Sequence, residues 1–182
     1  MTCRRCSTRW RNTIVSGNDD YKLQPARLAD AARLATMSHE FVEAGLRPSW
    51  DAARIGWHVR HEDSVVLTAC SAGMLAGFAI MRYGDERAHL NLLAVVPWHR
   101  RRGVARRLVG WLEETALTAG TFLITLELRE RNLEGRAFYA SLGYRELRQI
   151  PGYYQGVEAA LRMERDVRDG RTALPGTPQQ TP

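Results

Sequence analysis

The sequence predicts one α/β domain with a mixed, mostly antiparallel central sheet flanked by about four helices. Its length of 182 residues suits a single domain. Hydrophobic residues make up 45% of the chain and charged residues 25%, which is typical of a soluble fold and too apolar for general disorder. Short apolar runs alternate with amphipathic segments, and a hairpin turn joins two of those runs, which indicates helices layered on a sheet.

Hydrophobic periodicity and end signals place each element of this domain. The turn at 71–73 joins two apolar runs as a hairpin, Ser49 caps the second helix, and Asn132 caps the last one. Gly45 and Gly143 end helices, because glycine readily adopts the left-handed conformation. In chain order we expect a strand at 21–25, helices at 28–44 and 50–60, strands at 64–70, 74–83 and 89–96, a helix at 103–119, a strand at 121–128, a helix from 132 to 142, and strands at 144–150 and 158–165.

The two ends of the chain differ from this body in composition. Residues 1–20 lack periodicity and carry Arg4, Arg5, Arg9 and Arg11, which predicts a flexible basic extension. Residues 168–182 are rich in Pro, Gly, Thr and Gln, which predicts a disordered tail and leaves 21–167 as the folded domain. Much of the net charge of +6 therefore lies outside the folded body. Because a nucleic-acid-binding domain carries its excess charge on that body, the charge pattern does not favour a nucleic-acid partner.

The apolar runs and the cysteines bear on the cell compartment. The runs are far shorter than the ~20 residues that span a bilayer, and residues 1–20 contain no apolar core of a secretory signal. Cys3 and Cys6 have a metal-like spacing, but no second Cys or His pair stands at the distance that a four-coordinate site needs. Cys70 ends an apolar run and is expected in the core. We therefore expect a cytoplasmic protein with no membrane partner, disulfide scaffold or metal.

A basic, glycine-containing turn after a strand is the segment most informative about chemistry. It reads Arg100-Arg-Arg-Gly103-Val-Ala105 and leads directly into a predicted helix, while Trp98 and His99 before it are expected at the loop surface. A helix start exposes unpaired backbone N–H groups and the positive end of the helix dipole, which together bind phosphate. The small residues at 103 and 105 let a ligand approach the backbone. The P-loop and G-x-G-x-x-G patterns are both absent, so a different phosphate loop is indicated.

This turn resembles the pyrophosphate-binding motif Q/R-x-x-G-x-G/A of the Gcn5-related N-acetyltransferase (GNAT) superfamily. Residues 126–144 are similar to the family's later motif, E-x-R-x-x-N-x-x-A-x-x-x-Y-x-x-x-G-F/Y. The two motifs stand at a compatible separation, and the order of elements agrees over 21–165. Within the superfamily, the chain resembles the ribosomal-protein-alanine N-acetyltransferase type, which acetylates protein N-termini. It departs from the pattern at Gly135, where alanine is commoner, at Pro151-Gly152, and in its long N-terminal extension.

The resemblance implies the GNAT acyl-CoA acyltransferase fold, with acetyl-CoA as co-substrate and no metal. A break between two diverging strands lets the pantetheine pair like a strand, and the N–H of Val95 serves as oxyanion donor. Asn132 caps its helix, bonds to the pantetheine, or does both. The implied cofactor-binding residues are Leu93, Ala94, Val95, Arg100, Arg101, Arg102, Gly103, Val104, Ala105, Arg106, Asn132 and Arg136.

The resemblance also implies two catalytic residues. Glu127 is the candidate general base, acting through water, and partial burial at the end of an apolar run is expected to raise its pKa. Tyr139 is the candidate general acid toward the departing sulfur. Helical spacing puts Tyr139 on the same face as Asn132. The opposing apolar face, which we expect to contact the core, consists of Leu133, Ala137 and Ala140.

The acceptor is less well defined than the reaction. The residues expected to line its site are Tyr153, Tyr154 and 43–50. The resemblance favours a protein or peptide N-terminal α-amine, with a small-molecule amine (a polyamine, an amino acid or an antibiotic) as the alternative and a non-catalytic acyl-CoA-binding module as a further one. A cationic polyamine needs convergent acids, for which the chain offers Glu43 and Asp85-Glu86. Monomer and homodimer both stay open.

Overall fold

The computed structural model describes residues 21–169 of the chain. The expectations for 1–20 and 170–182, including those on Cys3 and Cys6, lie outside the described residues. The elements follow the predicted order, with two short 3-10 helices added. They are β1 (Lys22–Pro25), η1 (Leu28–Asp30), α1 (Ala31–Phe41), α2 (Ala52–Arg60), β2 (Ser64–Ser71), β3 (Met74–Tyr83), β4 (Arg87–Val95), η2 (Pro97–His99), α3 (Val104–Thr118), β5 (Leu123–Arg129), α4 (Leu133–Ser141), β6 (Arg145–Tyr154) and β7 (Glu158–Asp166).

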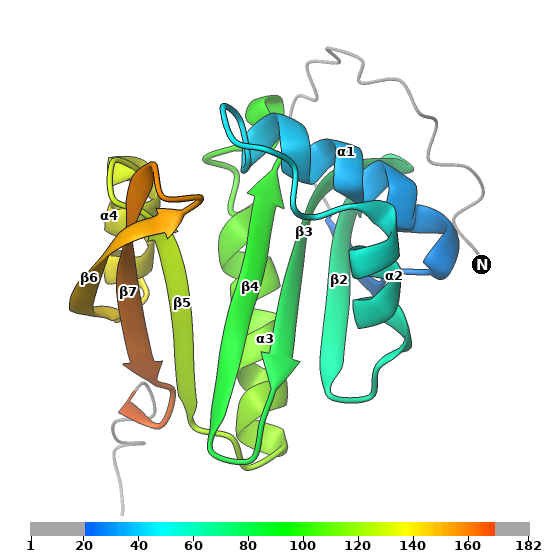
Figure 1. Cartoon of the computed structure of the whole chain (residues 1–182). Helices are drawn as coiled ribbons and strands as arrows, with labels where there is room; N and C mark the ends of the chain where they lie inside the picture. Colours follow the sequence, from blue (N-terminus) through cyan, green and yellow to red (C-terminus); the bar gives the residue numbers. More distant parts are fainter. Residues whose placement is uncertain (1–20, 170–182) are drawn as a thin grey trace, which may run out of the picture.

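The strands form one seven-stranded sheet in the order β1-β2-β3-β4-β5-β7-β6. Neighbouring strands are antiparallel except β4 and β5, which run parallel. A parallel pair needs a crossover connection, and α3 supplies it. Figure 1 shows α1 and α2 in front of β2, β3 and β4, with α3 behind them. The predicted mixed, mostly antiparallel sheet with four α-helices is therefore confirmed.

Each helical layer buries its own face of the sheet. One core cluster packs α3 and α4 against the sheet and includes Leu108 and Leu112. The other packs α1 and α2 against the opposite face and includes Met37 and Phe78, together with Cys70, whose predicted burial is confirmed. No helix in 21–169 has the length and apolar character that a membrane span requires. Because both faces of the central strands are covered, their ends are the parts left accessible to a ligand.

The helix boundaries on the α1–α2 side differ from those predicted. A 3-10 turn precedes α1, which ends at Phe41 instead of residue 44. The cap of α2 is Asp51, whose side chain accepts a hydrogen bond from the N–H of Arg54 at 2.7 Å. The prediction of Ser49 as the cap was wrong, because the chain stays non-helical through residue 51. The Ser49 hydroxyl instead donates to Glu43 at 2.6 Å.

The last hairpin also differs from the prediction. β6 continues four residues beyond the predicted end at Ile150 and passes through Pro151-Gly152. The register with β7 shifts between Ile150 and Tyr154, so the Pro-Gly pair lies in an irregular stretch of the strand. Gly152 has a φ of +64°, a conformation that glycine adopts without strain. Tyr153 and Tyr154 therefore belong to the end of β6.

β4 contains a bulge that changes which side chains face which core. Its register with β3 shifts between Ile80 and Met81, whose partners are Leu92 and Leu90, so Asn91 is an extra residue on β4. Leu90 lies in the core beneath α3, whereas Leu92 lies in the core beneath α1 and α2. In a regular strand, residues two apart share a face. The bulge therefore turns the last part of β4 over, next to the point where β4 and β5 part.

Candidate active site

β4 and β5 separate at one end of the sheet. The last paired residues are Leu90 and Leu126, although β4 continues to Val95 and β5 to Arg129. Figure 1 shows the two strands spreading apart there. Within the described part of the chain, residues 93–95 therefore have a strand partner in β3 and none in β5. An extended ligand can pair with such an edge, as the resemblance implies for pantetheine.

The basic turn joins β4 to α3 beside this gap. Arg101 and Gly103 have positive φ angles of +60° and +79°, which turn the chain sharply into the helix. The first intrahelical hydrogen bond of α3 runs from the N–H of Arg107 to the carbonyl of Gly103 at 3.0 Å. The N–H groups of residues 104–106 thus have no intrahelical acceptor. Together with the helix dipole they form the anion-binding geometry that the sequence predicts.

Buried contacts hold this turn from below. His99 is only 2% exposed, and its Nδ1 atom lies 3.0 Å from the hydroxyl of Tyr21. Trp98 is half-buried against the α1–α2 core. The expectation that both lie at the loop surface was wrong, because η2 turns them inward. The contact with Tyr21, 78 residues away in the chain, could not be predicted from the local sequence around His99.

Gly77 on β3 allows the start of α3 to lie close to the sheet. A Cβ added at Gly77 would lie 2.9 Å from the carbonyl oxygen of Ala94 and 3.1 Å from Cγ1 of Val104. A contact under 3.0 Å with a backbone atom forces something to move. Close packing of β3, β4 and the anion-binding helix start therefore depends on a glycine at this position.

Glu127, the candidate base, lies on β5 just beyond Leu126, the last residue that pairs with β4. Its side chain is 4% exposed, and each oxygen has its own partners. Oε1 accepts a hydrogen bond from Nε of Arg162 at 2.6 Å. Oε2 lies 3.1 Å from Nε2 of His89 and accepts a hydrogen bond from the hydroxyl of Tyr153 at 3.3 Å. Residues from β4, β6 and β7 therefore hold this one carboxylate.

The charge state of Glu127 differs from the sequence-based expectation. Burial pushes its pKa upward, as predicted, but the hydrogen bonds and charges of His89 and Arg162 outweigh burial and lower the pKa to about 2. Glu127 is therefore an anion throughout the neutral pH range. The predicted rise was wrong because the partners of Glu127 lie on other strands, where the local sequence does not reveal them.

Tyr139, the candidate acid, lies on α4 with its ring buried. The ring packs edge to face on Tyr144, with centroids 5.5 Å apart. Burial, followed by the proximity of Tyr154, raises the pKa of Tyr139, so the phenol is protonated at neutral pH. α4 is short and packs Phe138 and Tyr139 against the core. The predicted apolar face of this helix was wrong, since its members are exposed: Leu133, Ala137 and Ala140.

Two predicted cofactor contacts on α4 have partners within the protein. The side chain of Asn132 caps the helix, as predicted, by accepting a hydrogen bond from the N–H of Gly135 at 2.9 Å. A Cβ added at Gly135 would lie 2.6 Å from Nδ2 of Asn132, so glycine makes room for this cap. Arg136 forms a two-pronged ion pair with Glu146 on β6. Contact of Asn132 or Arg136 with a cofactor stays a prediction.

The α1–α2 loop and the β6–β7 hairpin meet at the same end of the sheet as Glu127. The N–H of Arg47 donates to Oε1 of Gln155 at 3.0 Å, and Nε2 of Gln155 donates to the carbonyl of Arg47 at 2.7 Å. Arg129 donates to the carbonyl of Ala44 at 2.8 Å. Beside them, Tyr153 is 47% exposed and contacts Tyr154 edge to face at 5.0 Å. We call this group of loops and strand ends the acceptor side.

The acids considered for a polyamine pocket do not converge. Glu43 is buried, and its carboxylate accepts hydrogen bonds from the N–H and hydroxyl of Ser49 at 2.7 and 2.6 Å and from the hydroxyl of Ser38 at 3.3 Å. It therefore fixes the α1–α2 loop from inside. Asp85 and Glu86 are exposed in the β3–β4 turn, at the opposite end of β4 from the strand gap.

Sequence reasoning missed three residues of this site: His89, Arg162 and Gln155. Arg162 is the cross-strand partner of Glu127, and His89 is the partner of Thr125, two residues before Glu127. The parallel and antiparallel registers on the two sides of β5 bring them together. A signal was present at His89, because a titratable residue between Ala88 and Leu90 interrupts a buried strand. Gln155 carried no comparable signal.

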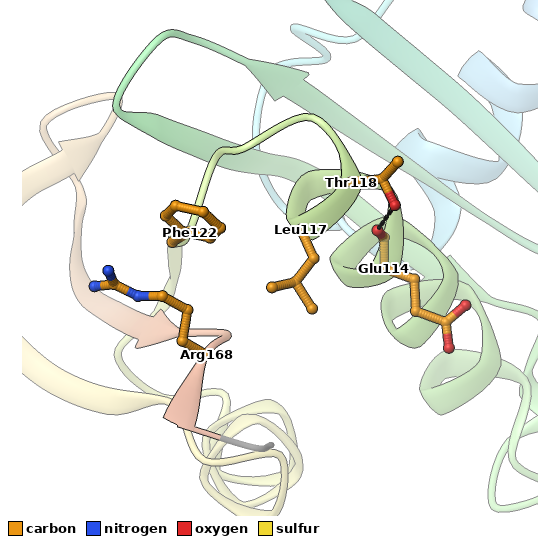
Figure 2. Close-up of a pocket in the computed structure, with 5 residues that line it drawn as sticks. All are labelled: Glu114, Leu117, Thr118, Phe122 and Arg168. Atoms are coloured by element: carbon orange, nitrogen blue, oxygen red, sulfur yellow. Dashed lines mark hydrogen bonds between the residues drawn. The ribbon is translucent and has the colours of Figure 1, made fainter. Parts of the chain in front are cut away.

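A separate hollow of about 550 Å³ lies at the C-terminal end of α3. Figure 2 shows Arg168 beside Phe122 across an open space from the helix, with the guanidinium 4.9 Å from the ring centroid. The lining residues are Glu114, Leu117, Thr118, Phe122 and Arg168. None of them is a predicted site residue. In the part of the chain that the structure describes, no three His, Cys, Asp or Glu side chains gather as a metal-binding group.

Comparisons with known proteins agree with this geometry. Residues 31–144 match the family model described as the acetyltransferase (GNAT) family. An uncharacterized protein of Mycobacterium leprae is 32% identical over 154 residues, which cover 81% of this chain and 42% of that protein. A ribosomal protein bS18-alanine N-acetyltransferase of Salmonella typhimurium is 37% identical over 92 residues, which cover 49% of this chain and 62% of that protein. The chain thus spans less than two thirds of either relative.

A solved structure gives the same picture for the fold. The crystal structure of the ribosomal-protein-S18-alanine N-acetyltransferase from Escherichia coli is similar with a TM-score of 0.70 and 25% identity. The similarity covers 81% of this chain and 94% of that chain. The fold and the resemblance predicted from the two sequence motifs are confirmed.

Proposed function

Because this chain belongs to the GNAT acetyltransferase family, we propose that it moves the acetyl group of acetyl-CoA to the N-terminal α-amine of a protein or peptide. The amine attacks the thioester directly within a ternary complex. One juxtaposition carries the proposal: an anion-binding helix start, an unpaired strand edge and a buried carboxylate with a tyrosine hydroxyl against it occur around a single strand gap.

The residues around the gap fit acetyl-CoA. The free N–H groups of residues 104–106, and Gly103 without a side chain, suit the pyrophosphate, and Arg100, Arg101 and Arg102 add positive charge. The edge at 93–95 suits the pantetheine, which carries amides that can pair with a strand. Arg100 also braces this edge, because its Nε donates to the carbonyl of Val95 at 3.2 Å. Acetyl-CoA supplies the activated acyl group, and this chain positions it.

Two proton transfers frame the attack. An α-ammonium must lose a proton before it can act as a nucleophile, and Glu127 is the carboxylate placed to receive that proton through water. The departing thiolate must gain a proton, and Tyr139 is the proposed donor. Burial raises the pKa of Tyr139, so the phenol carries its proton when the sulfur leaves.

A peptide amine suits the acceptor side better than a small cationic amine. Tyr153 presents a half-exposed ring next to Glu127, and the α1–α2 loop and β6–β7 hairpin flank it. The acids that a polyamine would need are buried or lie at the far end of β4. The two enzymes named above, to which the chain is similar, are named as alanine N-acetyltransferases of a ribosomal protein.

Thiol release from acetyl-CoA across a panel of amines tests the proposal. The panel pairs N-terminal peptides, including ribosomal ones that begin with alanine, with the same peptides blocked at the N-terminus, and adds polyamines and free amino acids. We expect turnover with the free peptides and none after blocking. Turnover with small amines alone would reassign the acceptor, and acetyl-CoA binding without any turnover would favour a non-catalytic acyl-CoA-binding module.

A further inference from the structure

We propose that Arg54 selects acceptor peptides by charge, because its guanidinium pairs with a carboxylate side chain within the first three residues of the peptide. This role rests on the proposed acetyl transfer and names the class of peptide that accepts the acetyl group. Its basis is a restrained cation, not neutralised by any described residue, at the edge of the acceptor side. Arg54 belongs to neither of the two family motifs and lies outside the residues predicted to line the acceptor site.

Two contacts hold the guanidinium of Arg54 in place. Its Cζ atom lies 3.9 Å from the ring centroid of Trp50, which is a cation–π arrangement. Its Nη1 atom donates a hydrogen bond to the carbonyl of Ser49 at 3.2 Å. Trp50 is only 8% exposed, so the aromatic platform under the guanidinium belongs to the core. A side chain restrained in this way loses less conformational entropy on binding a ligand than a freely rotating one does.

The guanidinium of Arg54 keeps donors for a ligand. Among residues 21–169, no carboxylate lies within ion-pairing distance of it. Asp51, the nearest acid in the sequence, caps α2 by accepting the backbone N–H of Arg54 at 2.7 Å. A guanidinium has five N–H donors in a planar fork, and the carbonyl of Ser49 occupies one nitrogen of that fork. The remaining donors suit the two oxygens of a carboxylate.

The loop under this cation is tied to the strand that carries Glu127. Glu43 fixes the end of the loop from within, since its carboxylate accepts the N–H of Ser49 at 2.7 Å. Arg129, two residues after Glu127 on β5, donates to the carbonyl of Ala44 at 2.8 Å. The platform under the guanidinium therefore has a fixed position relative to the carboxylate that the acceptor amine approaches.

The charge of Arg54 reaches the tyrosine beside that carboxylate. Burial and then Glu127 raise the pKa of Tyr153, whereas the charges of Arg162 and Arg54 lower it. The hydroxyl of Tyr153 donates to Oε2 of Glu127 at 3.3 Å. Charge interactions at the protein surface fade beyond about 10 Å, and an extended peptide advances about 3.3 Å per residue. The first three residues of a peptide with its amine at Glu127 therefore span the distance to the guanidinium.

The balance of charge around the amine position also favours an acidic peptide. Arg129 and Arg131 share one carboxylate, that of Glu158, at 2.8 and 2.9 Å. Arg162 pairs with Glu127 at 2.6 Å. These paired side chains leave an excess of positive charge, to which the guanidinium on α2 adds. Such a surface attracts an acidic peptide and repels one that carries lysine or arginine behind its amine.

Peptide pairs that differ in one charge test this selectivity. Each peptide begins with alanine and carries aspartate or asparagine at its second or third position, with otherwise uncharged side chains. We expect the wild type to show a kcat/KM about fivefold higher for the aspartate peptide than for its asparagine partner, the size of a well-oriented exposed ion pair. In Arg54→Gln, we expect this preference to fall below about twofold, with kcat/KM for the asparagine peptide nearly unchanged.

Three further variants separate charge from structure. Arg60→Gln removes the same charge from the other end of α2 and should leave the preference intact. Arg54→Lys keeps the charge and should retain part of the preference, whereas Arg54→Glu should favour peptides with lysine in place of aspartate. In the wild type, the preference should shrink as salt rises from about 0.05 to about 0.5 M, because salt screens the pair. An equal loss for both peptides of a pair in Arg54→Gln would make Arg54 a purely structural residue and overturn the proposal.

Calorimetric titration of the same peptides in the presence of coenzyme A measures the preference without turnover. If the wild type acetylates no peptide, the proposed function fails, and tighter binding of the aspartate peptides that disappears in Arg54→Gln would still support the acidic ligand class. Equal affinities and equal kcat/KM within every pair would overturn the proposal. Free aspartate and glutamate form the last arm. Turnover with these two amino acids and with no peptide would overturn both the peptide acceptor and the proposed role of Arg54.

Discussion

The two halves of the candidate site are built by different means. The cofactor half is a run of consecutive residues, 100–106, that presents backbone N–H groups at a helix start. The acceptor half consists of side chains brought together from β4, β5, β6 and β7, together with the α1–α2 loop. A backbone site tolerates side-chain changes except where a new Cβ intrudes. A side-chain cluster depends on each of its members and on the register of every strand.

The substitution with the largest expected effect separates the chemical step from acetyl-CoA binding. Tyr139→Phe removes the proposed proton donor and keeps the ring that packs on Tyr144. We expect kcat to fall by about 100-fold or more, because a positioned general acid typically contributes about 10²- to 10⁴-fold, with little change in acetyl-CoA affinity measured by calorimetry. The matched control, Tyr83→Phe, removes a hydroxyl that donates to the carbonyl of Leu112 away from the site. Unchanged turnover in Tyr139→Phe would exclude Tyr139 from the mechanism.

The cofactor half is most vulnerable at Gly77 on β3, where the start of α3 lies close to the sheet. Gly77→Ala places a Cβ 2.9 Å from the carbonyl of Ala94, so β4 and the start of α3 must move apart. We expect unfolding free energy to fall by about 2–3 kcal/mol in urea titrations, with weaker acetyl-CoA binding. Gly110→Ala is the control, because a Cβ there meets no atom within 4 Å and alanine favours the helix. Equal stability of the two variants would mean that Gly77 is not needed for the close approach.

This difference between the halves explains what the sequence could predict. The order of elements along the chain and the helix cap at Asn132 follow from local patterns, and both are confirmed. The turn at 100–103 leads into a helix start, as predicted, and its anion binding stays a prediction. The pKa of Glu127 did not follow, because Arg162 and His89 meet it through strand pairing. The packing of α4 was mispredicted for a related reason. In so short a helix, contact with the sheet decides which face is buried. The aromatic residues of α4 pack against the core, and its alanines are exposed.

His58 on α2 and Glu127 on β5 are expected to affect the stability of the fold in different pH ranges. Burial, then Arg54 and Arg82, lower the pKa of His58 from 6.5 to about 4. The unfolded chain therefore takes up a proton at a higher pH than the folded one, and stability is lost as pH falls from about 6.5 to about 4. Glu127 acts lower. Its folded pKa of about 2 means that its contribution is lost between about 4.5 and 2.

Substitutions of His58 and of Glu127 test whether these residues cause the loss of stability in the two pH ranges. His58→Asn should remove a loss on the order of 2 kcal/mol between pH 6.5 and 4, measured by urea unfolding at several pH values. Glu127→Gln should leave that window intact and flatten the curve below pH 4.5. A wild-type slope in His58→Asn between pH 6.5 and 4 would show that another group titrates there.

The smallest expected effect tests whether exposed hydrogen bonds between the α1–α2 loop and the β6–β7 hairpin help to shape the acceptor half, in addition to its buried contacts. Gln155→Ala removes both hydrogen bonds between the β6–β7 hairpin and the backbone of Arg47. These bonds are exposed, so their loss should cost less than about 1 kcal/mol of stability. Because the α1–α2 loop is then tied to the hairpin end by fewer contacts, we expect KM for the peptide to rise severalfold while acetyl-CoA affinity stays constant. Gln149→Ala on β6, in the same hairpin, is the control, since its side chain bonds to Glu130 away from the loop. If both variants raise KM equally, the contact between hairpin and loop does not shape the acceptor side, and the cluster around Glu127 alone defines it.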